Sequence, residues 1–349
     1  MTLIAQGTEP ALGSDSQGNP HVVYQDRGIW YTFRNASGEW LASPVKLSGF
    51  GMDARLFLDE DDDVHVVWSA GGGSGNEGWY TNNVGEGWKE PVMVCDVDQS
   101  GGDRVMLGRV VKIVDEDLVV AVWNVGGDEE VFVAIRNLSS TRPTVLRRAN
   151  HSNIWPPGLI LDENGSGFKT IARNFRGHNM VVSEFGSDLA LQGSAMATSG
   201  GMIEGECASG FRTPDGIGHY TGSPLGEDLT KPAVDHLWYN NDERIGSGQP
   251  AIVGEAITDG DNSNWSEICV DATGRAYLVH NSGLEPGLFF TYREADQLLT
   301  FTLDVNYTVP PGIGLRYGPM CSSTSSSGVH VVYQLGNDIY HRTIGVLTQ

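Results

Sequence analysis

The segment Asp15-Ser-Gln-Gly-Asn-Pro-His-Val-Val-Tyr24 carries a pattern that recurs along the whole chain. A turn rich in Asp or Gly precedes a short run of β-branched and aromatic residues, which is typical of a hairpin turn leading into a buried strand. Six further copies occur at residues 59–68, 115–123, 162–171, 215–220, 271–280 and 329–333. The copies follow one another at roughly 45 to 57 residues, a spacing that indicates propeller blades rather than single hairpins.

The residues around each copy complete a unit of four strands. In the first unit, further β-rich runs at 29–33 and 40–47 follow the His21 segment, separated by turn signals. The run before each Asp turn, such as 54–58 in the second unit, supplies the fourth strand. Four antiparallel strands repeated radially predict an all-β, seven-bladed β-propeller. After the last copy the chain has room for one more strand, so residues 2–5 are expected to supply the missing outer strand and close the ring, which leaves no long exposed edge.

Composition narrows the class of protein. The 349 residues include 46 Gly and 15 Pro, without a linker-like stretch, so one domain over residues 1–349 is expected. The net charge of −22 argues against nucleic-acid binding. No apolar run is long enough to cross a membrane. The N-terminus lacks a signal-peptide pattern, which predicts a cytoplasmic protein, or an extracellular or periplasmic one whose leader was removed.

Cofactor signals are weak. The four cysteines, Cys95, Cys207, Cys269 and Cys321, show no metal-ligand spacing and are expected to be buried free thiols. The run Asp59-Glu-Asp-Asp-Asp63 could bind a structural Ca²⁺, although it coincides with a hairpin turn. We therefore expect no required cofactor, no catalytic metal and a monomeric protein.

Polar residues gather in the loops that enter the innermost strands and in those that follow the second strands. In a propeller both sets open onto one face. The entering loops carry Asp53, Arg55, Arg104, His151, Trp155, Glu206, Glu267, Arg316 and Tyr317. The loops after the second strands carry Arg173, Arg176, His178 and Tyr220. A ring of cationic, carboxylate and aromatic side chains is typical of a sugar-binding site, because aromatic faces stack on sugar rings and Arg or His bind carboxylates.

The densest part of this ring lies on the fourth and fifth predicted blades. Its residues fall in Asn150-His-Ser-Asn-Ile-Trp155, Arg173-Asn-Phe-Arg-Gly-His178 and His219-Tyr220. Here the sequence resembles the seven-bladed propeller polysaccharide lyases, such as ulvan lyases, within the wider group of sialidase-like propellers. The resemblance covers the whole chain at the level of its repeats. It implies a site in which His, Arg and Tyr from neighbouring blades act together on an oligosaccharide or polysaccharide.

The implied chemistry is β-elimination at a uronic acid. Its carboxylate must be neutralised so that a base can remove the α-proton, and an acid then protonates the leaving oxygen. By this resemblance Arg173 or Arg176 holds the carboxylate, Tyr220 serves as base or acid, and His151 and His178 share the remaining proton transfers. His219 alternates with Tyr220 along the strand, so only one of the two should point inward. The predicted binding residues further include Trp155, Arg55, Arg316, Tyr317 and Glu267.

Two other functions remain open. A sialidase-like hydrolase could use Arg residues for a carboxylate, a Tyr paired with Glu, and an Asp; the candidates are Arg55, Arg104, Arg316, Tyr317, Glu206 or Glu267, and Asp53. However, the Asp-box of that group is absent, with only a loose echo in residues 14–18. A non-catalytic glycan-binding propeller is the second alternative. The inner-face residues differ from blade to blade, which favours one central site over several equal ones.

Overall fold

The computed structural model describes most of the β framework of the chain. The residues described are 1–71, 76–85, 87–97, 105–113, 118–125, 129–140, 143–150, 158–161, 167–174, 179–196, 209–213, 216–222, 238–253, 266–271, 273–281, 287–295, 297–304, 320–324 and 328–345. Within them the protein is almost entirely β, as the sequence predicts. The only helix described is the five-residue α1 (Asp242–Gly246), so none of the helical structure seen here could cross a membrane.

The described strands form seven four-stranded antiparallel sheets. The first three comprise β2 (Thr8–Ser14), β3 (Pro20–Gln25), β4 (Ile29–Phe33) and β5 (Val45–Ser48); β6 (Met52–Leu58), β7 (Val64–Gly71), β8 (Asn76–Asn82) and β9 (Val92–Val97); and β10 (Val105–Ile113), β11 (Leu118–Val125), β12 (Glu129–Arg136) and β13 (Thr144–Asn150). The next two comprise β14 (Gly158–Leu161), β15 (Gly167–Asn174), β16 (Asn179–Gly186) and β17 (Leu191–Met196); and β18 (Ser209–Arg212), β19 (Gly218–Gly222), β20 (Trp238–Asn241) and β21 (Ile252–Val253). The last two comprise β22 (Ser266–Val270), β23 (Ala276–Asn281), β24 (Leu288–Glu294) and β25 (Gln297–Asp304); and β26 (Met320–Thr324), β27 (Gly328–Leu335), β28 (Asp338–Ile344) and β1 (Thr2–Gln6).

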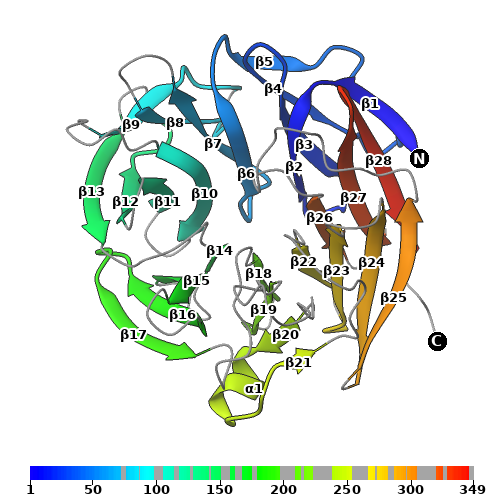
Figure 1. Ribbon diagram of the computed structural model, residues 1–349. Helices are drawn as coiled ribbons and strands as arrows, with labels where there is room; N and C mark the ends of the chain where they lie inside the picture. The colour runs from blue at the N-terminus through cyan, green and yellow to red at the C-terminus, as the bar shows by residue number, and fades with distance from the viewer. Residues whose placement is uncertain are drawn as a thin grey trace, which may run out of the picture.

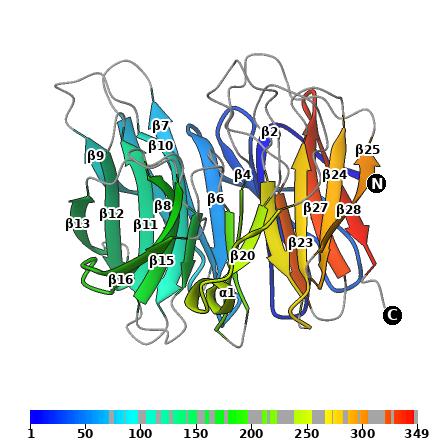
Figure 2. The same cartoon turned by 60° about the horizontal axis from the view of Figure 1, so that its bottom comes forward.

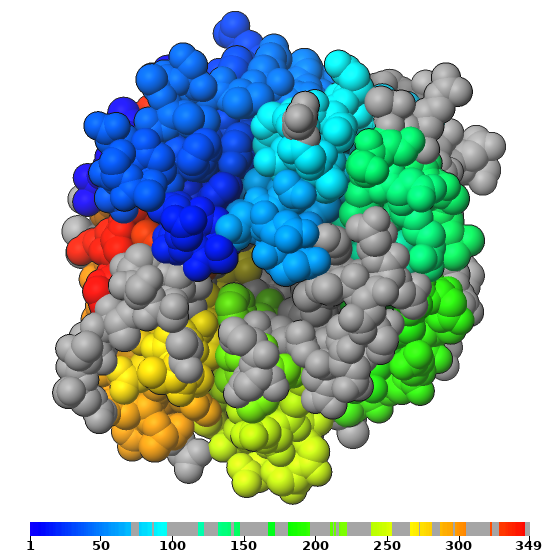
Figure 3. All heavy atoms as spheres, turned by 180° about the vertical axis from the view of Figure 1, so that it is seen from behind, coloured from blue at the N-terminus to red at the C-terminus, as the bar shows by residue number. Residues whose placement is uncertain are grey.

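The sheets are arranged around a common axis (Figure 1). The first strand of each sheet contacts the first strand of the next, from β2 through β6, β10, β14, β18 and β22 to β26, and β26 in turn contacts β2. The strands of successive sheets run side by side along the axis, with α1 at one end of the disc (Figure 2). Seen from behind, the surface is hollowed near the axis, between blue segments of the first two sheets and green and yellow segments of later ones (Figure 3). This is the arrangement of a β-propeller.

The first and last strands of the chain pair with each other in the last sheet. Strand β1 pairs antiparallel with β28, with Thr2 opposite His341. Just beyond β1, the backbone N–H of Gly7 donates to the carbonyl of Asn337 at 2.7 Å. The edge of the C-terminal hairpin is thereby covered by the N-terminal strand.

Two outer strands begin later than the sequence patterns predict. The run 40–47 is expected to be a strand, but β5 begins at Val45, and Trp40 makes only an isolated bridge with Arg34. Likewise the corresponding run of the second unit, residues 88–94, is expected to be a strand but becomes one only from Val92. Each of these strands starts directly after a proline, Pro44 or Pro91. Proline has no N–H to donate to the ladder, so it marks the boundary.

Neighbouring sheets pack through apolar side chains that alternate along the strands. Between the first and second sheets, the buried cluster includes Ala11, Val23, Val66 and Trp68. Between the second and third sheets, Val67 and Tyr80 pack with Val119, Ala121 and Val133. The Val-Val pair of the repeated motif is thus explained, because successive side chains point to opposite faces and each serves a different intersheet core.

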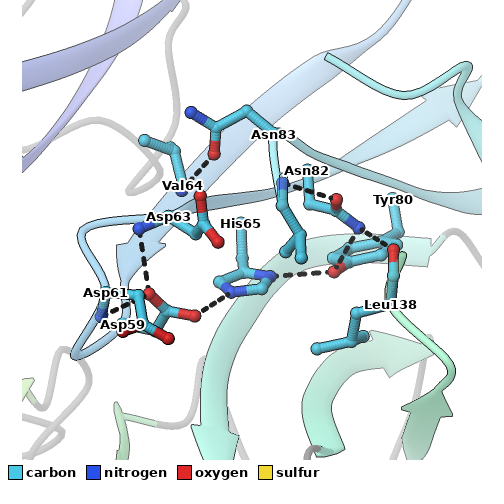
Figure 4. Close-up of polar contacts among 10 residues, drawn as sticks. Asp59, Asp61, Asp63, Val64, His65, Tyr80, Asn82, Asn83 and Leu138 are labelled. Carbon is cyan, nitrogen blue, oxygen red and sulfur yellow. Dashed lines mark hydrogen bonds and ion pairs between the residues drawn. The ribbon is translucent and has the colours of Figure 1, made fainter. Parts of the chain in front are cut away.

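The repeated spacing between Asp and His in the motif also has a structural cause, seen most completely in the second sheet (Figure 4). The Nε2 atom of His65 lies 3.1 Å from Asp59 Oδ2, and its Nδ1 lies 2.8 Å from the hydroxyl of Tyr80. The other oxygen of Asp59 accepts the backbone N–H groups of Asp61 and Asp63 at 3.0 and 2.9 Å. The turn, the second strand and the third strand are therefore held together by one buried network.

Other sheets contain variants of this network at the same positions. In the first sheet, Tyr31, His21 and Asp15 are the equivalent residues, and the Tyr31 hydroxyl lies 2.6 Å from His21 Nδ1. Further equivalents are the pairs His219 with Tyr239 at 2.7 Å, Asp271 with Tyr277 at 2.7 Å, and His330 with His341 at 2.9 Å. A polar group that recurs in this way in sheet after sheet is a feature of the fold rather than a single active site.

Candidate functional site

A different polar group lies at the opposite end of β6. The register between β6 and β7 shifts between Met52, which faces Ser69, and Arg55, which faces Val67, so Asp53 and Ala54 form a bulge. Asp53 has a φ of +55° there, in the left-handed region. Bulges often re-aim a side chain near a functional site.

The same bulge occurs in two neighbouring inner strands. In β2 the shift falls between Thr8 and Ala11, and Glu9 has a φ of +56°. In β10 the register shifts between Met106 and Arg109, so Arg109 occupies the register position of Arg55. The bulge is therefore a repeated element, but the residues on it differ from strand to strand.

Glu9 uses its bulge position to join the first sheet to the second. Its Oε2 atom accepts the backbone N–H of Asp53 at 2.7 Å. The amide nitrogen of Gln25, oriented to face this carboxylate, lies 2.7 and 2.8 Å from its two oxygens. The backbone N–H of Glu9 donates to Gln334 Oε1 at 3.0 Å, which extends the chain of contacts to the last sheet.

The side chains of Asp53 and Arg55 are buried without such partners. They are 1% and 5% exposed, respectively. Both carboxyl oxygens of Asp53, and the Nε and one terminal nitrogen of Arg55, have no hydrogen-bond partner; the other terminal nitrogen donates to the Ala54 carbonyl at 2.8 Å. The buried hydroxyl of Ser69 is also unpartnered. Most buried polar groups in proteins are paired, and an uncompensated buried charge is costly.

Arg55 and Ser69 lie on the same face of the second sheet. Arg55 is opposite Val67, which packs against Val119 and Ala121 of the third sheet. Ser69 is two residues further along β7 and so shares that face. Trp68 lies on the other face, packed with the first sheet, where Gly51 leaves room for its indole; a Cβ at Gly51 would lie 2.3 Å from Trp68 Cδ1. Arg55 and Ser69 thus face the boundary between the second and third sheets, whereas Asp53 lies in the bulge opposite Trp68 and is bonded through its N–H to Glu9 of the first sheet.

Four of the residues predicted from the sequence, Asp53, Arg55, Tyr220 and Glu267, are described with their side chains. Asp53 and Arg55 are in β6, Tyr220 in β19 and Glu267 in β22, so they come from three different sheets. Glu267 is partly exposed and faces Val279 in the register. Arg173 lies in β15 opposite Met180. The other predicted site residues, His151, His178, Arg176, Trp155, Arg316 and Tyr317, fall outside the described residues, so their roles stay predictions.

Tyr220 is fully buried, and its hydroxyl is engaged. It donates to Asp242 Oδ1 at 2.7 Å, while Asp242 Oδ2 accepts from the Gly218 N–H at 2.8 Å and lies 3.1 Å from Lys169 Nζ. These contacts are at the start of β19, whereas the predicted site adjoins the loop that follows this strand. His219 faces the opposite side, toward Tyr239. A catalytic role for Tyr220 stays a prediction, and it would require this hydroxyl to leave Asp242.

The expected metal and thiol features are only partly visible. In the turn predicted to bind Ca²⁺, Asp59 belongs to the His65 network, and Asp62 accepts from the N–H and hydroxyl of Ser16 at 2.6 and 2.7 Å. No cluster of three or more His, Cys, Asp or Glu suited to a metal occurs in the part of the chain that the structure describes. Calcium binding stays a prediction. Cys95 and Cys269 are buried free thiols, as expected.

Sequence reasoning missed two residues of this region, Glu9 and Ser69. The signal that could have found Glu9 is its position, because Glu9-Pro-Ala and Asp53-Ala-Arg stand at equivalent places before the first two Asp turns. The absence of partners around Asp53 and Arg55 has no sequence signature.

Comparisons with known proteins agree on the fold only. No protein-family model and no curated protein matches the chain. Hydrazine synthase from Kuenenia stuttgartiensis is similar with a TM-score of 0.58 and 11% identity, over 99% of this chain and 97% of that one. A periplasmic gluconolactonase from Pseudomonas aeruginosa is similar with a TM-score of 0.54 and 15% identity, over 86% of each chain. A putative 6-phosphogluconolactonase from Bacteroides fragilis has a TM-score of 0.52 and 14% identity, over 86% of this chain and 84% of that one.

These similarities support a β-propeller but not the narrower resemblance to ulvan lyases. At such low identities they establish the arrangement of the strands and leave the chemistry to the residues of this chain.

Proposed function

We propose that the protein is a carbohydrate-active enzyme, a seven-bladed propeller closed by β1, that acts on an acidic sugar near the axis at the Asp53 end of β6. The observation that carries this proposal is the buried guanidinium of Arg55, which has two unpartnered nitrogens, in the same strand as the unpartnered carboxyl group of Asp53. Arginine binds carboxylates with parallel hydrogen bonds and stays charged when buried. A sugar carboxylate would supply the partner that the protein itself does not.

The fold is compatible with such chemistry. Two of the structures that are similar in fold are described as a gluconolactonase and a putative 6-phosphogluconolactonase, and this supports the proposal of a sugar-derived ligand. Unequal residues at the repeated bulge favour one site on the axis over seven equivalent lectin sites.

The reaction that we propose first is β-elimination on a uronic-acid polysaccharide, by a monomer that needs no cofactor. Arg55 would neutralise the uronate carboxylate and so make the α-proton easier to remove. The proton transfers would fall to the His151, His178 and Tyr220 set predicted from the sequence, with Arg173 or Arg176 as further carboxylate ligands. Hydrolysis is the second candidate. It is favoured by the carboxyl group of Asp53, two residues from Arg55, because a carboxyl group is a suitable general acid or base.

The test is an assay on a panel of uronic-acid polysaccharides, ulvan among them. Elimination creates a conjugated double bond that absorbs in the ultraviolet, whereas hydrolysis releases reducing ends without it. We expect an absorbance increase with the unmodified protein, a loss of at least about a hundredfold in Arg55→Met, and normal activity in Arg136→Met. Arg136 is an exposed arginine at the end of β12, so it controls for loss of charge alone.

Each other outcome has a definite meaning. Reducing ends without absorbance would replace elimination by hydrolysis. No product from any substrate, or full activity in Arg55→Met, would overturn the proposed site.

A further inference from the structure

We propose that Asp53 and Ser69, together with Arg55, form a subsite that selects hydroxy acids over simple carboxylic acids, and that Glu9 is the residue that positions it. This inference rests on the proposed function, because it assigns the hydroxyl-recognising part of the same site. It assigns the recognition of ligand hydroxyl groups to Asp53, in addition to the recognition of the carboxylate by Arg55.

The first step is the hydrogen-bonding capacity that the protein leaves unused. Asp53 offers two oxygen acceptors, Arg55 offers donors on two nitrogens, and Ser69 offers a hydroxyl that can act either way. All three side chains are buried, and two of them carry groups that strongly prefer a partner. Although Asp53 and Arg55 are two residues apart, their side chains are not paired with each other.

The second step is the chemistry that could satisfy all of these groups together. A simple anion would pair with Arg55 but would be repelled by an ionised Asp53. A simple cation would pair with Asp53 but would be repelled by Arg55. A sugar acid carries an acceptor carboxylate and neighbouring hydroxyls that donate, so one molecule can match both ends of the subsite. Recognition through buried polar groups is also selective, because a ligand without the hydroxyl leaves them unpaired.

The third step is the support that Glu9 gives to Asp53. Asp53 adopts a left-handed φ of +55°, which a non-glycine residue holds only when its surroundings fix it. The Glu9 carboxylate accepts the Asp53 N–H at 2.7 Å and is itself held by Gln25. Through Gln334 the same network reaches β27 of the last sheet. Glu9 therefore fixes the bulge from the neighbouring sheet without facing the ligand.

The experiment measures binding of three probes by NMR titration: D-glucuronate, D-glucose and cyclohexanecarboxylate. Glucuronate has both the carboxylate and the hydroxyls, and each of the other two probes lacks one kind of group. For the unmodified protein we expect glucuronate to bind about tenfold more tightly than either of the others.

The variants separate the two roles. In Asp53→Asn, the binding of glucuronate should weaken by about tenfold, while cyclohexanecarboxylate should bind at least as tightly as before, because the repulsion by Asp53 is removed. In Arg55→Met, the binding of both glucuronate and cyclohexanecarboxylate should be lost. Asp61→Asn removes an exposed carboxyl group in the turn at the other end of the same strand, and should change nothing. Asparagine tolerates the left-handed region well, so Asp53→Asn should fold normally.

Glu9 is tested by a conservative pair. Glu9→Gln keeps an oxygen that can accept the Asp53 N–H and should retain the preference for glucuronate. Glu9→Ala should lose that preference while still binding cyclohexanecarboxylate, which a general loss of structure would not produce.

The results that would overturn this proposal differ from those that would overturn the proposed function. If Asp53→Asn binds glucuronate normally while Arg55→Met does not, the hydroxyl subsite is wrong and the carboxylate site stands. If the unmodified protein does not prefer glucuronate, the subsite is wrong whatever the polysaccharide assay shows. If Glu9→Ala keeps the preference, Glu9 has no positioning role.

Discussion

The two ends of strand β6 both bear buried polar side chains, and they differ in whether those groups have partners. At the turn end, Asp59 is bonded to His65 and to two backbone N–H groups. At the other end, Asp53 and Arg55 are just as deeply buried, yet most of their polar atoms have no partner. The first arrangement recurs in other sheets, whereas the second is seen in β6 among the inner strands whose side chains are described. Buried polar groups that satisfy one another maintain a fold, and buried groups that do not are candidates for binding something else.

The strongest way to probe this contrast is to damage the satisfied end. Replacing Asp59 by alanine removes the acceptor of two turn N–H groups and of His65, all within a buried region. We expect Asp59→Ala to reduce the free energy of unfolding by about 3 kcal/mol, measured by urea denaturation. A loss no larger than that of the exposed control Asp61→Asn would show that the network contributes little to stability.

Acid should weaken another variant of the same network. Burial and the neighbouring His330 lower the pKa of His341 to about 3, and burial lowers the pKa of His330. Between pH 6.5 and about 3, the unfolded chain binds a proton at His341 that the native protein does not. The contribution of His341 to the free energy of unfolding should therefore be fully present above pH 6.5. It should be lost as the pH decreases, by about 1.4 kcal/mol per pH unit.

The first, second and fifth sheets supply a control for that prediction. They have Tyr31, Tyr80 and Tyr239 where the last sheet has His341. His341→Tyr should remove much of the decrease in the free energy of unfolding between pH 7.5 and pH 5, measured by urea titration at each pH. An unchanged dependence would assign the acid sensitivity to other groups.

The smallest expected effect on stability, and of the opposite sign, is at the unsatisfied end. Arg55→Met replaces an uncompensated buried charge by an apolar chain of similar length, so we expect the free energy of unfolding to rise by about 1 kcal/mol. The same variant should lose binding of acidic sugars. If Arg55→Met is instead strongly destabilised, Arg55 has a structural role and the contrast between the two ends of β6 fails.

Much of the architecture could be predicted because its causes are local. The repeated turn-and-strand motif, with Val22 and Val23 on opposite faces, predicts the four-stranded antiparallel units that are observed. The hydrophobic pattern alone predicts earlier starts for β5 and β9 than are observed, because it does not register the prolines that precede them, Pro44 and Pro91. Arg55 was predicted as a binding residue and Asp53 as a member of the alternative hydrolase set, but nothing in the sequence linked either of them to Glu9.

The role of the repeated histidines also could not be predicted from the sequence. His21 and His65 are recognised in the sequence only as part of the repeated motif, and their contacts with tyrosine and aspartate reveal that they belong to a repeated structural network. For Tyr220, the strand was placed correctly, whereas the contact of its hydroxyl with Asp242 depends on α1, a helix that no repeat pattern predicts.

The sequence by itself determined the all-β class, the four-strand unit and the acidic character of the protein, since these depend on periodicity, turn residues and composition. The tertiary structure alone decided which buried polar atoms have partners. That property depends on side chains brought together from different sheets, such as Glu9 with Asp53, across separations in the chain that local patterns do not encode. The distinction between a polar group that stabilises this fold and one that is free to bind a ligand is therefore made by packing, not by residue type.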